Sequence, residues 1–486
     1  MPRRTKIVAS LGPATDDPRA LDDLIHAGVD VCRINFSHGT EAQHLQRVET
    51  VRNRARAHGR QVGIIADLQG PKIRIGSFRQ DTVNLVEGEM FTLDAEMDIE
   101  AGDNQQVGLV YKDLPDDVAR GDTLLLDDGA IVLWVDDVEG KKISCRVVVG
   151  GELSNNKGIN KQGGGLSAGA LTEKDMQDIK LAAKMEADYL ALSFPRNAAD
   201  IEQARQLFRA AGGHGGIIAK IERAEALENI EEIIKASDVI MIARGDLGVE
   251  IGDAELPGVQ KRLIHQARTM NRIVITATQM MQSMIEQHTP TRAEVMDVAN
   301  AVLDGTDAVM LSAETSVGKH PAKVISAMSK ICIGAEKQRE AMVSTHRMDI
   351  RFEHVDEAIA MAAMYTANHL GAAAIVSLTE SGSTPQWMSR ISSGIPIYAM
   401  TSRVGTRRKV TLYRGVYPVS FKPDFTDHAI VNKEAIDDLV RRGAVRDGDL
   451  VIITKGDLAG TAGGTNAMKI VKVGGLYTPE YCKIDT

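Results

Sequence analysis

Hydrophobic and polar positions follow a strand–helix rhythm over most of the chain. Short apolar runs of strand length are separated by stretches in which apolar residues recur at helical spacing. Amphipathic helices are expected over 41–58, 172–185 and 292–303, and Thr172 with Asp175 resembles a capping box at the start of the second. The runs expected to be strands are 6–10, 30–36, 62–67, 187–194, 216–222, 238–244, 272–278 and 307–314.

About eight strand–helix units predict an α/β fold, because a closed (β/α)8 TIM barrel needs that number. A doubly wound open sheet is the alternative on pattern alone. In either fold, binding groups gather at the carboxyl ends of the parallel strands. Polar residues at strand exits are therefore the first candidates for a functional site.

The strand–helix rhythm is interrupted after the third expected strand, where helical periodicity is absent. Short β runs separated by turn residues follow one another there instead. We expect them to form an inserted β-barrel lid domain, hinged at Gly70-Pro71 and at the glycine-rich stretch 163–169. A fixed β extension is the alternative. The β runs are 82–94, 122–135 and 141–151.

A third unit follows the barrel pattern. A helix is expected over 357–370, and later apolar runs alternate with helical stretches, which predicts a small C-terminal α/β domain. Its expected strands are 373–379, 396–401, 416–421 and 450–454. The expected division is 1–70 and 170–345 for the barrel domain, 71–169 for the lid and 346–486 for the C-terminal domain.

Composition and charge narrow the class of function. Of 486 residues, 43% are hydrophobic and 25% charged, which is typical of a soluble globular protein. The net charge of −9 argues against a nucleic-acid or membrane surface as the main partner. The four cysteines form no CxxC pair and indicate reduced thiols. The sequence shows no signal peptide or transmembrane run, so a cytoplasmic location is expected.

The segment 217–248, IIAKIERAEALENIEEIIKASDVIMIARGDLG, holds the densest chemistry. Side chains alternate along a strand, so Lys220 and Glu222 point the same way at one strand exit. Gly245 and Asp246 follow the next strand. One lysine and two carboxylates at neighbouring strand ends can bind a divalent metal and an anion together. A surface salt-bridge cluster is the alternative.

The second expected strand ends in RINFSHG, which places Arg33, Asn35 and Ser37 on one face. The planar guanidinium of Arg33 suits a phosphate group. Asn35, Ser37 and Asp67 offer oxygens of the kind that a monovalent cation takes. This strand exit therefore indicates a second, phosphate-binding part of the same site.

These motifs resemble those of a known family. IIAKIERAEAL resembles the active-site signature of pyruvate kinases, ARGDLG resembles their metal-binding strand end, and RINFSHG with ADLQGPKIR extends the likeness over essentially the whole chain. The resemblance implies Mg²⁺-dependent transfer of a phosphoryl group from phosphoenolpyruvate to ADP, giving pyruvate and ATP in the last step of glycolysis. Mn²⁺ is a possible substitute for Mg²⁺, and a homotetramer is expected.

The resemblance also implies roles for individual residues. Catalysis falls to Lys220, Arg33, Thr278 and Ser312, the last two by orienting the water that protonates the enolate. Substrate contacts fall to Arg33, Lys220, Gly245, Asp246 and Thr278, and metal ligation to Glu222 and Asp246. Nucleotide contacts fall to Arg74, Lys157, His38 and Asn35, with Asp128 as a weaker candidate beside the metal–nucleotide.

The stretch SLTESGSTPQWM of the C-terminal domain resembles the family loop that binds a phosphorylated effector. Family members activated by a sugar bisphosphate carry a hydroxyl where this chain has Glu380. A carboxylate beside a phosphate is repulsive, so a monophosphorylated sugar or AMP is the expected effector. The second loop, GDLAGTAGGTN, could close over it. The expected effector residues are Thr379, Ser381, Gly382, Ser383 and Thr384.

The first hinge also bears on the need for potassium. Potassium-dependent pyruvate kinases resemble one another in having glutamate after the Gly-Pro hinge, and Lys72 stands there in this chain. A tethered ammonium can supply the charge that K⁺ would, so K⁺ is expected not to be required. The alternative is a solvated hinge lysine, with K⁺ still bound at Asn35, Ser37 and Asp67.

The residues, taken without the family resemblance, leave three other functions open. The first is a barrel lyase that acts on 2-keto acids with the same carboxylates, which would not need the lid and Lys157. The second is a catalytically inactive sugar-phosphate sensor, which would not need the site residues intact. The third is a Schiff-base aldolase built on Lys220, whose nearby carboxylate favours the protonated amine instead.

Overall fold

The computed structural model describes residues 2–71, 73–342, 351–422, 428–457 and 463–475, and its centre is a closed barrel of eight parallel strands. The barrel closes by pairing β1 with β16, which confirms the TIM barrel and excludes the open sheet. The strands in barrel order are β1 (Lys6–Ser10), β16 (Ala308–Leu311), β15 (Ile273–Ala277), β14 (Val239–Ala243), β13 (Gly216–Ile221), β12 (Tyr189–Leu192), β3 (Gly63–Asp67) and β2 (Val31–Asn35).

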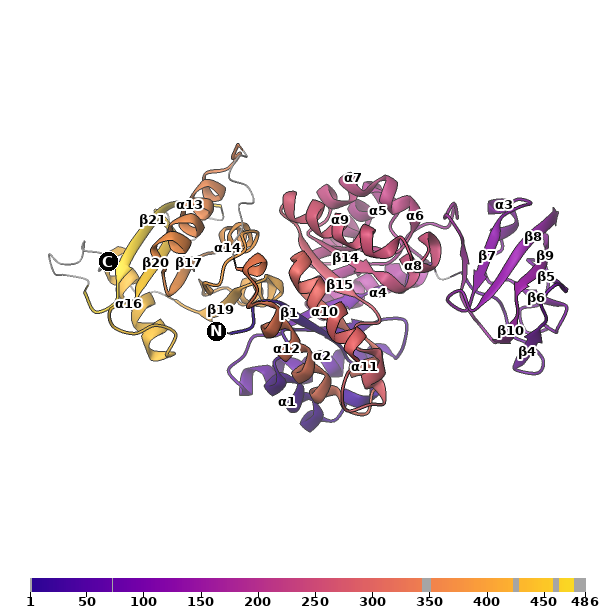
Figure 1. Cartoon of the computed structure of the whole chain (residues 1–486), viewed down its shortest axis with the longest axis horizontal. Helices are drawn as coiled ribbons and strands as arrows, with labels where there is room; N and C mark the ends of the chain where they lie inside the picture. Colours follow the sequence, from indigo (N-terminus) through magenta and orange to yellow (C-terminus); the bar gives the residue numbers. More distant parts are fainter. Residues whose placement is uncertain (1, 72, 343–350, 423–427, 458–462, 476–486) are drawn as a thin grey trace.

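The barrel helices form the outer layer around these strands (Figure 1). The capping box expected at Thr172 is present, since its hydroxyl accepts from Asp175 N and the carboxylate of Asp175 accepts from Thr172 N. The longer helices are α1 (Pro18–Ala27), α2 (Glu41–Ala57), α4 (Glu173–Lys184), α5 (Ala198–Ala210), α7 (Ile230–Ala236), α8 (Arg244–Ile251), α9 (Leu256–Thr269), α10 (Arg292–Asp304) and α12 (Pro321–Ala335). No helix among the described residues is long and apolar enough to cross a membrane.

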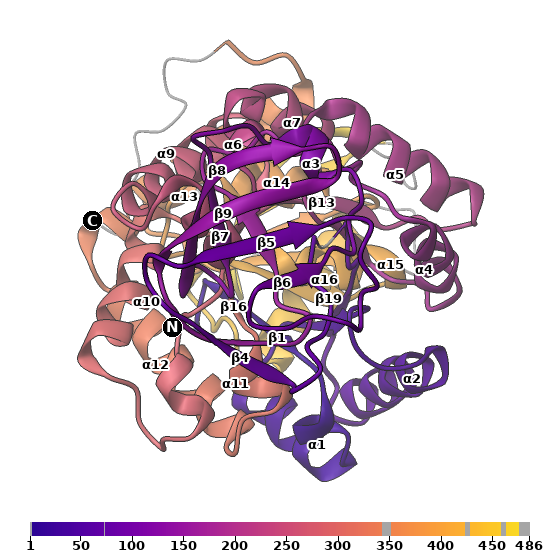
Figure 2. The ribbon, with the colours of Figure 1, turned by 90° about the vertical axis from the view of Figure 1, so that its right-hand side faces the viewer.

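The inserted β domain, which is expected to act as a lid, leaves the barrel after β3 and lies to one side of it in Figure 1; Figure 2 shows it in front of the barrel. It consists of a six-stranded sheet in the order β11-β7-β8-β9-β5-β6 and a two-stranded sheet of β10 and β4. A short helix, α3 (Leu114–Asp117), was not expected. The strands are β4 (Thr82–Leu85), β5 (Met90–Asp94), β6 (Gln106–Gly108), β7 (Thr123–Leu126), β8 (Ile131–Glu139), β9 (Lys142–Val149), β10 (Gly151–Ser154) and β11 (Ile159–Lys161).

The C-terminal domain is a five-stranded sheet in the order β19-β18-β17-β20-β21. Its last strand was missed, because most of its side chains are at least partly exposed and it lacks the apolar run that marks a buried strand. The strands are β17 (Ala374–Leu378), β18 (Ile397–Thr401), β19 (Val416–Ser420), β20 (Leu450–Gly456) and β21 (Thr465–Lys472). The helices are α13 (Val355–Leu370), α14 (Ser383–Ser389), α15 (Val404–Lys409) and α16 (His428–Arg441).

The C-terminal domain packs on the amino ends of the barrel strands, opposite the lid (Figure 1). Lys6, the first residue of β1, donates to the carbonyl of Val416 at 2.6 Å. The fully buried guanidinium of Arg390 pairs with the carboxylate of Asp307, which precedes β16. Asp307 also accepts from the backbone of β15 at Val274. The carboxyl ends of the strands are thus left to the site and the lid.

Candidate active site

The side chain of Lys220 is buried among the ends of three neighbouring barrel strands, with 9% of the residue exposed. Its ammonium lies 2.9 Å from Glu222 Oε1 and 3.4 Å from Asp67 Oδ1. It also donates a 2.7 Å hydrogen bond to Ser193 Oγ, at the end of β12. The structure therefore brings Lys220 and Glu222 together at one strand exit and adds Asp67 from β3.

Burial and the neighbouring carboxylates act against each other on the pKa of Lys220. Burial lowers this pKa, but the charges of Asp67 and Glu222 outweigh it, so the pKa of Lys220 is raised. The lysine is held as an ammonium, which argues against the free amine of a Schiff-base aldolase. Burial raises the pKa of Glu222 to about 7; Lys220 opposes that rise and the charge of Asp246 adds to it.

Asp246 lies in the first turn of α8, directly after β14. Gly245 donates its backbone N–H to Thr278 Oγ1 at 2.8 Å, which joins the ends of β14 and β15. Thr278 has a left-handed backbone, with φ of 69°, which is strained for a β-branched residue and is typical of functional sites. Arg244 braces this corner by donating to the carbonyl of Thr278 and pairing with Asp297.

Arg33 is fixed at the end of β2 by two side chains. Its Nε donates to Asp67 Oδ2 at 2.5 Å, and its Nη1 donates to Ser10 Oγ at 2.9 Å. Arg33, Asn35 and His38 line a cavity of about 420 Å³, which is within the range of small-ligand sites. This cavity is the place that the structure offers for a substrate beside the phosphate-binding face.

The expected eighth strand is too long at its carboxyl end. The strand stops at Leu311, and Ser312 precedes a short helix, α11 (Ala313–Ser316). The reason is local: the buried carboxylate of Glu314 accepts from Ser312 N at 2.7 Å and from Met281 N at 3.2 Å, which turns the chain. Ser312 remains partly exposed at the barrel mouth.

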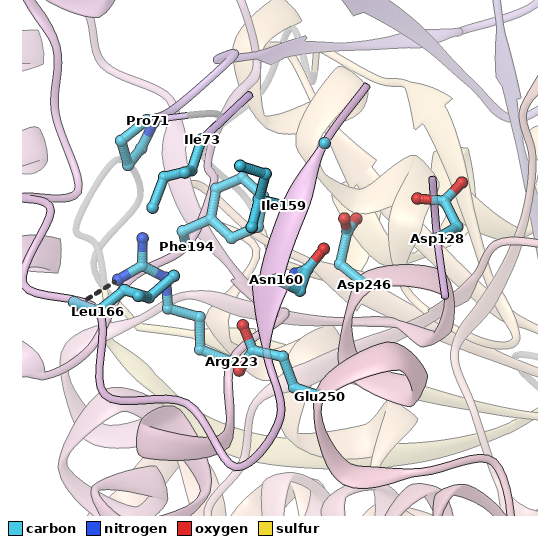
Figure 3. A pocket seen from close by; sticks show the side chains of 11 residues that line it. Pro71, Ile73, Asp128, Ile159, Asn160, Leu166, Phe194, Arg223, Asp246 and Glu250 are labelled. Carbon is cyan, nitrogen blue, oxygen red and sulfur yellow. Dashed lines mark hydrogen bonds between the residues drawn. The ribbon is translucent and has the colours of Figure 1, made fainter. Parts of the chain in front are cut away.

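The nucleotide residues expected on the lid side lie apart from the 420 Å³ cavity. Lys157 pairs with Asp127 at 2.7 Å, and Arg74 donates to the carbonyl of Asn156 at 2.6 Å. Asp128 lines a narrow cavity of about 20 Å³ together with Asp246, between lid and barrel (Figure 3). Lys72 lies outside the described residues.

The donor set fits a hard divalent cation. Among the residues that the structure describes, no three His, Cys, Asp or Glu side chains form a ready metal cage. Glu222 and Asp246 provide two carboxylates close enough for the charge of one to raise the pKa of the other. Mg²⁺ prefers one or two carboxylates and completes its shell with water and substrate oxygens. Glu222 and Asp246 are therefore the candidate ligands.

The loop expected to bind an effector is closed by hydrogen bonds between its own residues. Gly382 N donates to Thr379 Oγ1, and Ser381 Oγ donates to Ser383 Oγ. Ser383 Oγ in turn donates to a carboxylate oxygen of Asp356 at 3.2 Å. Thr384 shares a 2.7 Å hydrogen bond with Thr465, the Glu380 carboxylate pairs with Arg403, and residues 458–462 of the second loop are not described.

The sequence interpretation missed several residues that support the site. Ser193 contacts Lys220, Phe194 N donates to Glu222 Oε2 at 2.9 Å, and Arg223 contacts the second lid hinge. Glu250 lines the cavity shared with Asp246, and burial raises its pKa to about 7. Their positions in the sequence could have pointed to these residues. Ser193 and Phe194 end an expected strand, and Arg223 directly follows Glu222.

Comparison with known proteins agrees with this geometry. The family described as pyruvate kinase, barrel domain, matches residues 2–325, and that described as pyruvate kinase, alpha/beta domain, matches 357–471. A pyruvate kinase II of Salmonella typhimurium is 55% identical over 475 residues, covering 97% of this chain and 99% of that protein. A pyruvate kinase of Haemophilus influenzae is 54% identical over 463 residues, covering 94% and 97%. The crystal structure of a pyruvate kinase from Cryptosporidium parvum aligns with a TM-score of 0.89 and 32% identity, covering 97% of this chain and 96% of that one.

Proposed function

The chain belongs to the pyruvate kinase family, and from that premise we propose how its barrel mouth moves a phosphoryl group from phosphoenolpyruvate to ADP. The observation that carries the proposal is the buried ammonium of Lys220, held 2.9 Å from Glu222 and 3.4 Å from Asp67. A fixed positive charge at a strand end neutralises negative charge that develops during phosphoryl transfer.

Each site residue has one part in the proposed mechanism. Lys220 stabilises the phosphoryl group as its bond to the enolate oxygen breaks, and the guanidinium of Arg33 grips the same group. Thr278 and Ser312 orient the water that protonates the enolate, since a threonine hydroxyl is a poor acid at neutral pH. Glu222 and Asp246 would hold Mg²⁺, which would supply positive charge next to the phosphoryl group.

The substrate carboxylate is assigned to the first turn of α8. Backbone N–H groups at a helix start favour an anion, and Gly245 has no side chain to block its approach. In the structure Gly245 N donates to the Thr278 hydroxyl. We infer that the substrate carboxylate competes for that N–H and frees the hydroxyl to bind water.

The nucleotide is assigned to the space between the barrel mouth and the lid. His38 and Asn35 border the 420 Å³ cavity from the barrel side. Arg74 and Lys157 approach from the lid side when domain 71–169 closes on its hinges. An assay for pyruvate, run with and without ADP, tests the whole proposal. A lyase would release product without ADP, and a sensor would release none.

The proposed metal site has an expected pH dependence. Because burial raises the pKa of Glu222 to about 7, its carboxyl is largely protonated below that pH, and a proton competes with Mg²⁺. The Mg²⁺ concentration for half-maximal activity is therefore expected to rise several-fold between about pH 8 and about pH 6. Titrations of Mg²⁺ at a series of pH values measure this; a requirement that stays constant over the range would contradict the assignment of Glu222.

Potassium independence is the next expectation, and it rests on Lys72. Activity with Mg²⁺ in a buffer free of sodium and potassium is expected to be close to that at about 0.1 M K⁺, because the tethered ammonium supplies the cation's charge. Lys72→Glu should then create a K⁺ requirement that is only partial, because Leu68 and Gln69 remain and match the potassium-independent members of the family.

The matched control is Lys112→Glu, which makes the same charge change at an exposed lid position. It should leave activity independent of K⁺. A wild-type enzyme that is nearly inactive without K⁺ would refute the role of Lys72. It would favour the alternative, in which K⁺ binds at Asn35, Ser37 and Asp67.

Allosteric activation by a monophosphorylated sugar or AMP is proposed at 379–384. The Glu380 carboxylate disfavours a second phosphate there, although its pairing with Arg403 partly offsets the charge. The effector should lower the apparent KM for phosphoenolpyruvate by about 5–150-fold, the usual range of coupling. A double variant, Ser381→Asp with Ser383→Asp, is expected to abolish activation and preserve basal turnover. Activation that survives in it would place the effector elsewhere; Ser402→Asp, at an exposed position outside the loop, is the charge control.

We also propose that the enzyme works in the cytoplasm as a homotetramer. The three cysteines that the structure describes, Cys32, Cys145 and Cys332, are free and buried, which fits a reducing compartment. The tetramer follows from the family alone.

A further inference from the structure

β12 ends in a two-residue corner, Ser193–Phe194, that contacts both charged groups of the next strand. Ser193 Oγ accepts from the Lys220 ammonium at 2.7 Å and donates to the carbonyl of Leu68 at 2.7 Å. The backbone N–H of Phe194 donates to Glu222 Oε2 at 2.9 Å, leaving Oε1 to Lys220. One corner therefore fixes the lysine and the glutamate relative to each other.

The backbone of this corner is strained. Phe194 has φ of 56°, in the left-handed region that a bulky residue rarely adopts. Such conformations persist only where the surrounding contacts impose them. The guanidinium carbon of Arg223 lies 5.4 Å from the centre of the Phe194 ring, within cation–π range. The contact with Arg223 and the hydrogen bond to Glu222 together hold Phe194 in place.

The corner contacts the first hinge of the lid directly and the second hinge through Arg223. At the first hinge, a Cβ on Gly70 would lie 2.8 Å from Ser193 Cβ and 3.0 Å from the Phe194 ring, so only glycine fits there. At the second hinge, Arg223 Nη1 donates to the carbonyl of Leu166 at 3.3 Å and to that of Ala168 at 3.4 Å. Figure 3 draws the hydrogen bond to Leu166, with the Phe194 side chain nearby. Ser193–Phe194 is therefore packed against the first hinge and joined to the second by one arginine side chain.

We propose that Ser193–Phe194 is a positioning element that aims Lys220 and Glu222 and couples their geometry to the hinges of the lid. The proposal rests on the function proposed above, since it assigns Lys220 and Glu222 the roles given there. Ser193 holds the ammonium by one charge-assisted hydrogen bond and touches no reacting atom. Arg223 transmits the position of the second hinge through the Phe194 ring.

Two substitutions of Ser193 separate hydrogen bonding from packing. Ser193→Ala removes the hydroxyl, and Ser193→Cys keeps a similar size but offers a weak acceptor. Both substitutions are expected to lower kcat by about 10–100-fold and to change the KM for phosphoenolpyruvate by less than about threefold. A misplaced ammonium weakens the stabilisation of the transition state more than it weakens substrate binding. Thermal unfolding of each variant shows whether the fold is intact.

Full activity in Ser193→Cys would reduce the residue to a packing role and overturn the proposal. So would Ser193→Ala within about twofold of wild type, or a loss of kcat that follows the loss of stability. These outcomes leave the proposed function standing, because the wild-type enzyme still makes pyruvate from phosphoenolpyruvate and ADP. A wild-type enzyme that makes none would overturn both.

A double-mutant cycle tests the coupling to the lid. Arg223→Met removes the contacts with the Phe194 ring and the second hinge, and its effect on kcat is expected to be non-additive with that of Ser193→Ala, by at least about threefold. Arg196→Met is the matched control, since Arg196 donates to the carbonyl of Ser167 in the same hinge. Its effect should add to that of Ser193→Ala. Additivity in both cycles would contradict the coupling.

Discussion

Replacing Lys220 with methionine is expected to lower kcat for pyruvate formation by at least about 10³-fold, because one preorganised charge at the transition state contributes several kcal/mol. Methionine keeps the length and the apolar stem of the side chain and removes only the ammonium. Glu222 and Asp246 remain, so metal binding should survive at a pH high enough to ionise Glu222, whose pKa rises once the ammonium is gone. The measurements are pyruvate formation with saturating substrates and, separately, binding of Mn²⁺ as a spectroscopic substitute for Mg²⁺.

The control for this variant is Lys174→Met. Lys174 also lies near the barrel mouth, where its ammonium contacts the carbonyl of Phe36 and the carboxylate of Asp178. Removing that charge should change kcat far less than removing the charge of Lys220. Turnover near the wild-type level in Lys220→Met would end the assignment of Lys220 as the residue that stabilises the transferred group.

The second large effect is expected at the metal carboxylates. Glu222→Ala or Asp246→Ala should raise the Mg²⁺ concentration for half-maximal activity by more than about tenfold, because each variant removes one of the two proposed protein ligands. Titrations of activity against Mg²⁺ and direct binding of Mn²⁺ measure the effect. A normal response to Mg²⁺ in both variants would mean that the metal is held elsewhere.

Glu250→Gln is the matched control for these variants. Its carboxylate lines the same narrow cavity as Asp246, but it accepts from Ala224 N rather than facing Lys220. The amide keeps the size of the side chain and removes its charge. The Mg²⁺ requirement should therefore stay near that of the wild type; a shift as large as that of Asp246→Ala would show that any nearby carboxylate matters.

The sequence predicted the barrel well because buried parallel strands are continuous apolar runs that end in charge. The run at 6–10 is the strand Lys6–Ser10 to the residue, and Lys220, Glu222 and Asp246, at the exits of the fifth and sixth expected strands, meet at the barrel mouth. The prediction was wrong where a side chain turned the chain, as Glu314 does, and where a strand was exposed, as Thr465–Lys472 is.

The supporting contacts were beyond the reach of periodicity. Nothing in an apolar run shows that Phe194 will adopt a left-handed backbone, since that conformation comes from its contacts with Glu222 and Arg223. The loop at 379–384 illustrates the same limit. Glu380 was interpreted as a charge that repels a second phosphate, and its partner Arg403, which lies 23 residues later in the chain, meets it only in the folded domain.

The ion pair between Arg390 and Asp307 bears on how the two domains can change in evolution. Arg390 follows α14 and Asp307 precedes β16, and both side chains are at most 1% exposed. If a neutral residue replaced either partner, the other would be left as an uncompensated charge buried between the domains. Loss of one partner from such a pair typically costs about 3–5 kcal/mol, a large part of a domain's stability. We therefore expect that a change at one of the two positions is selected against unless the other changes with it.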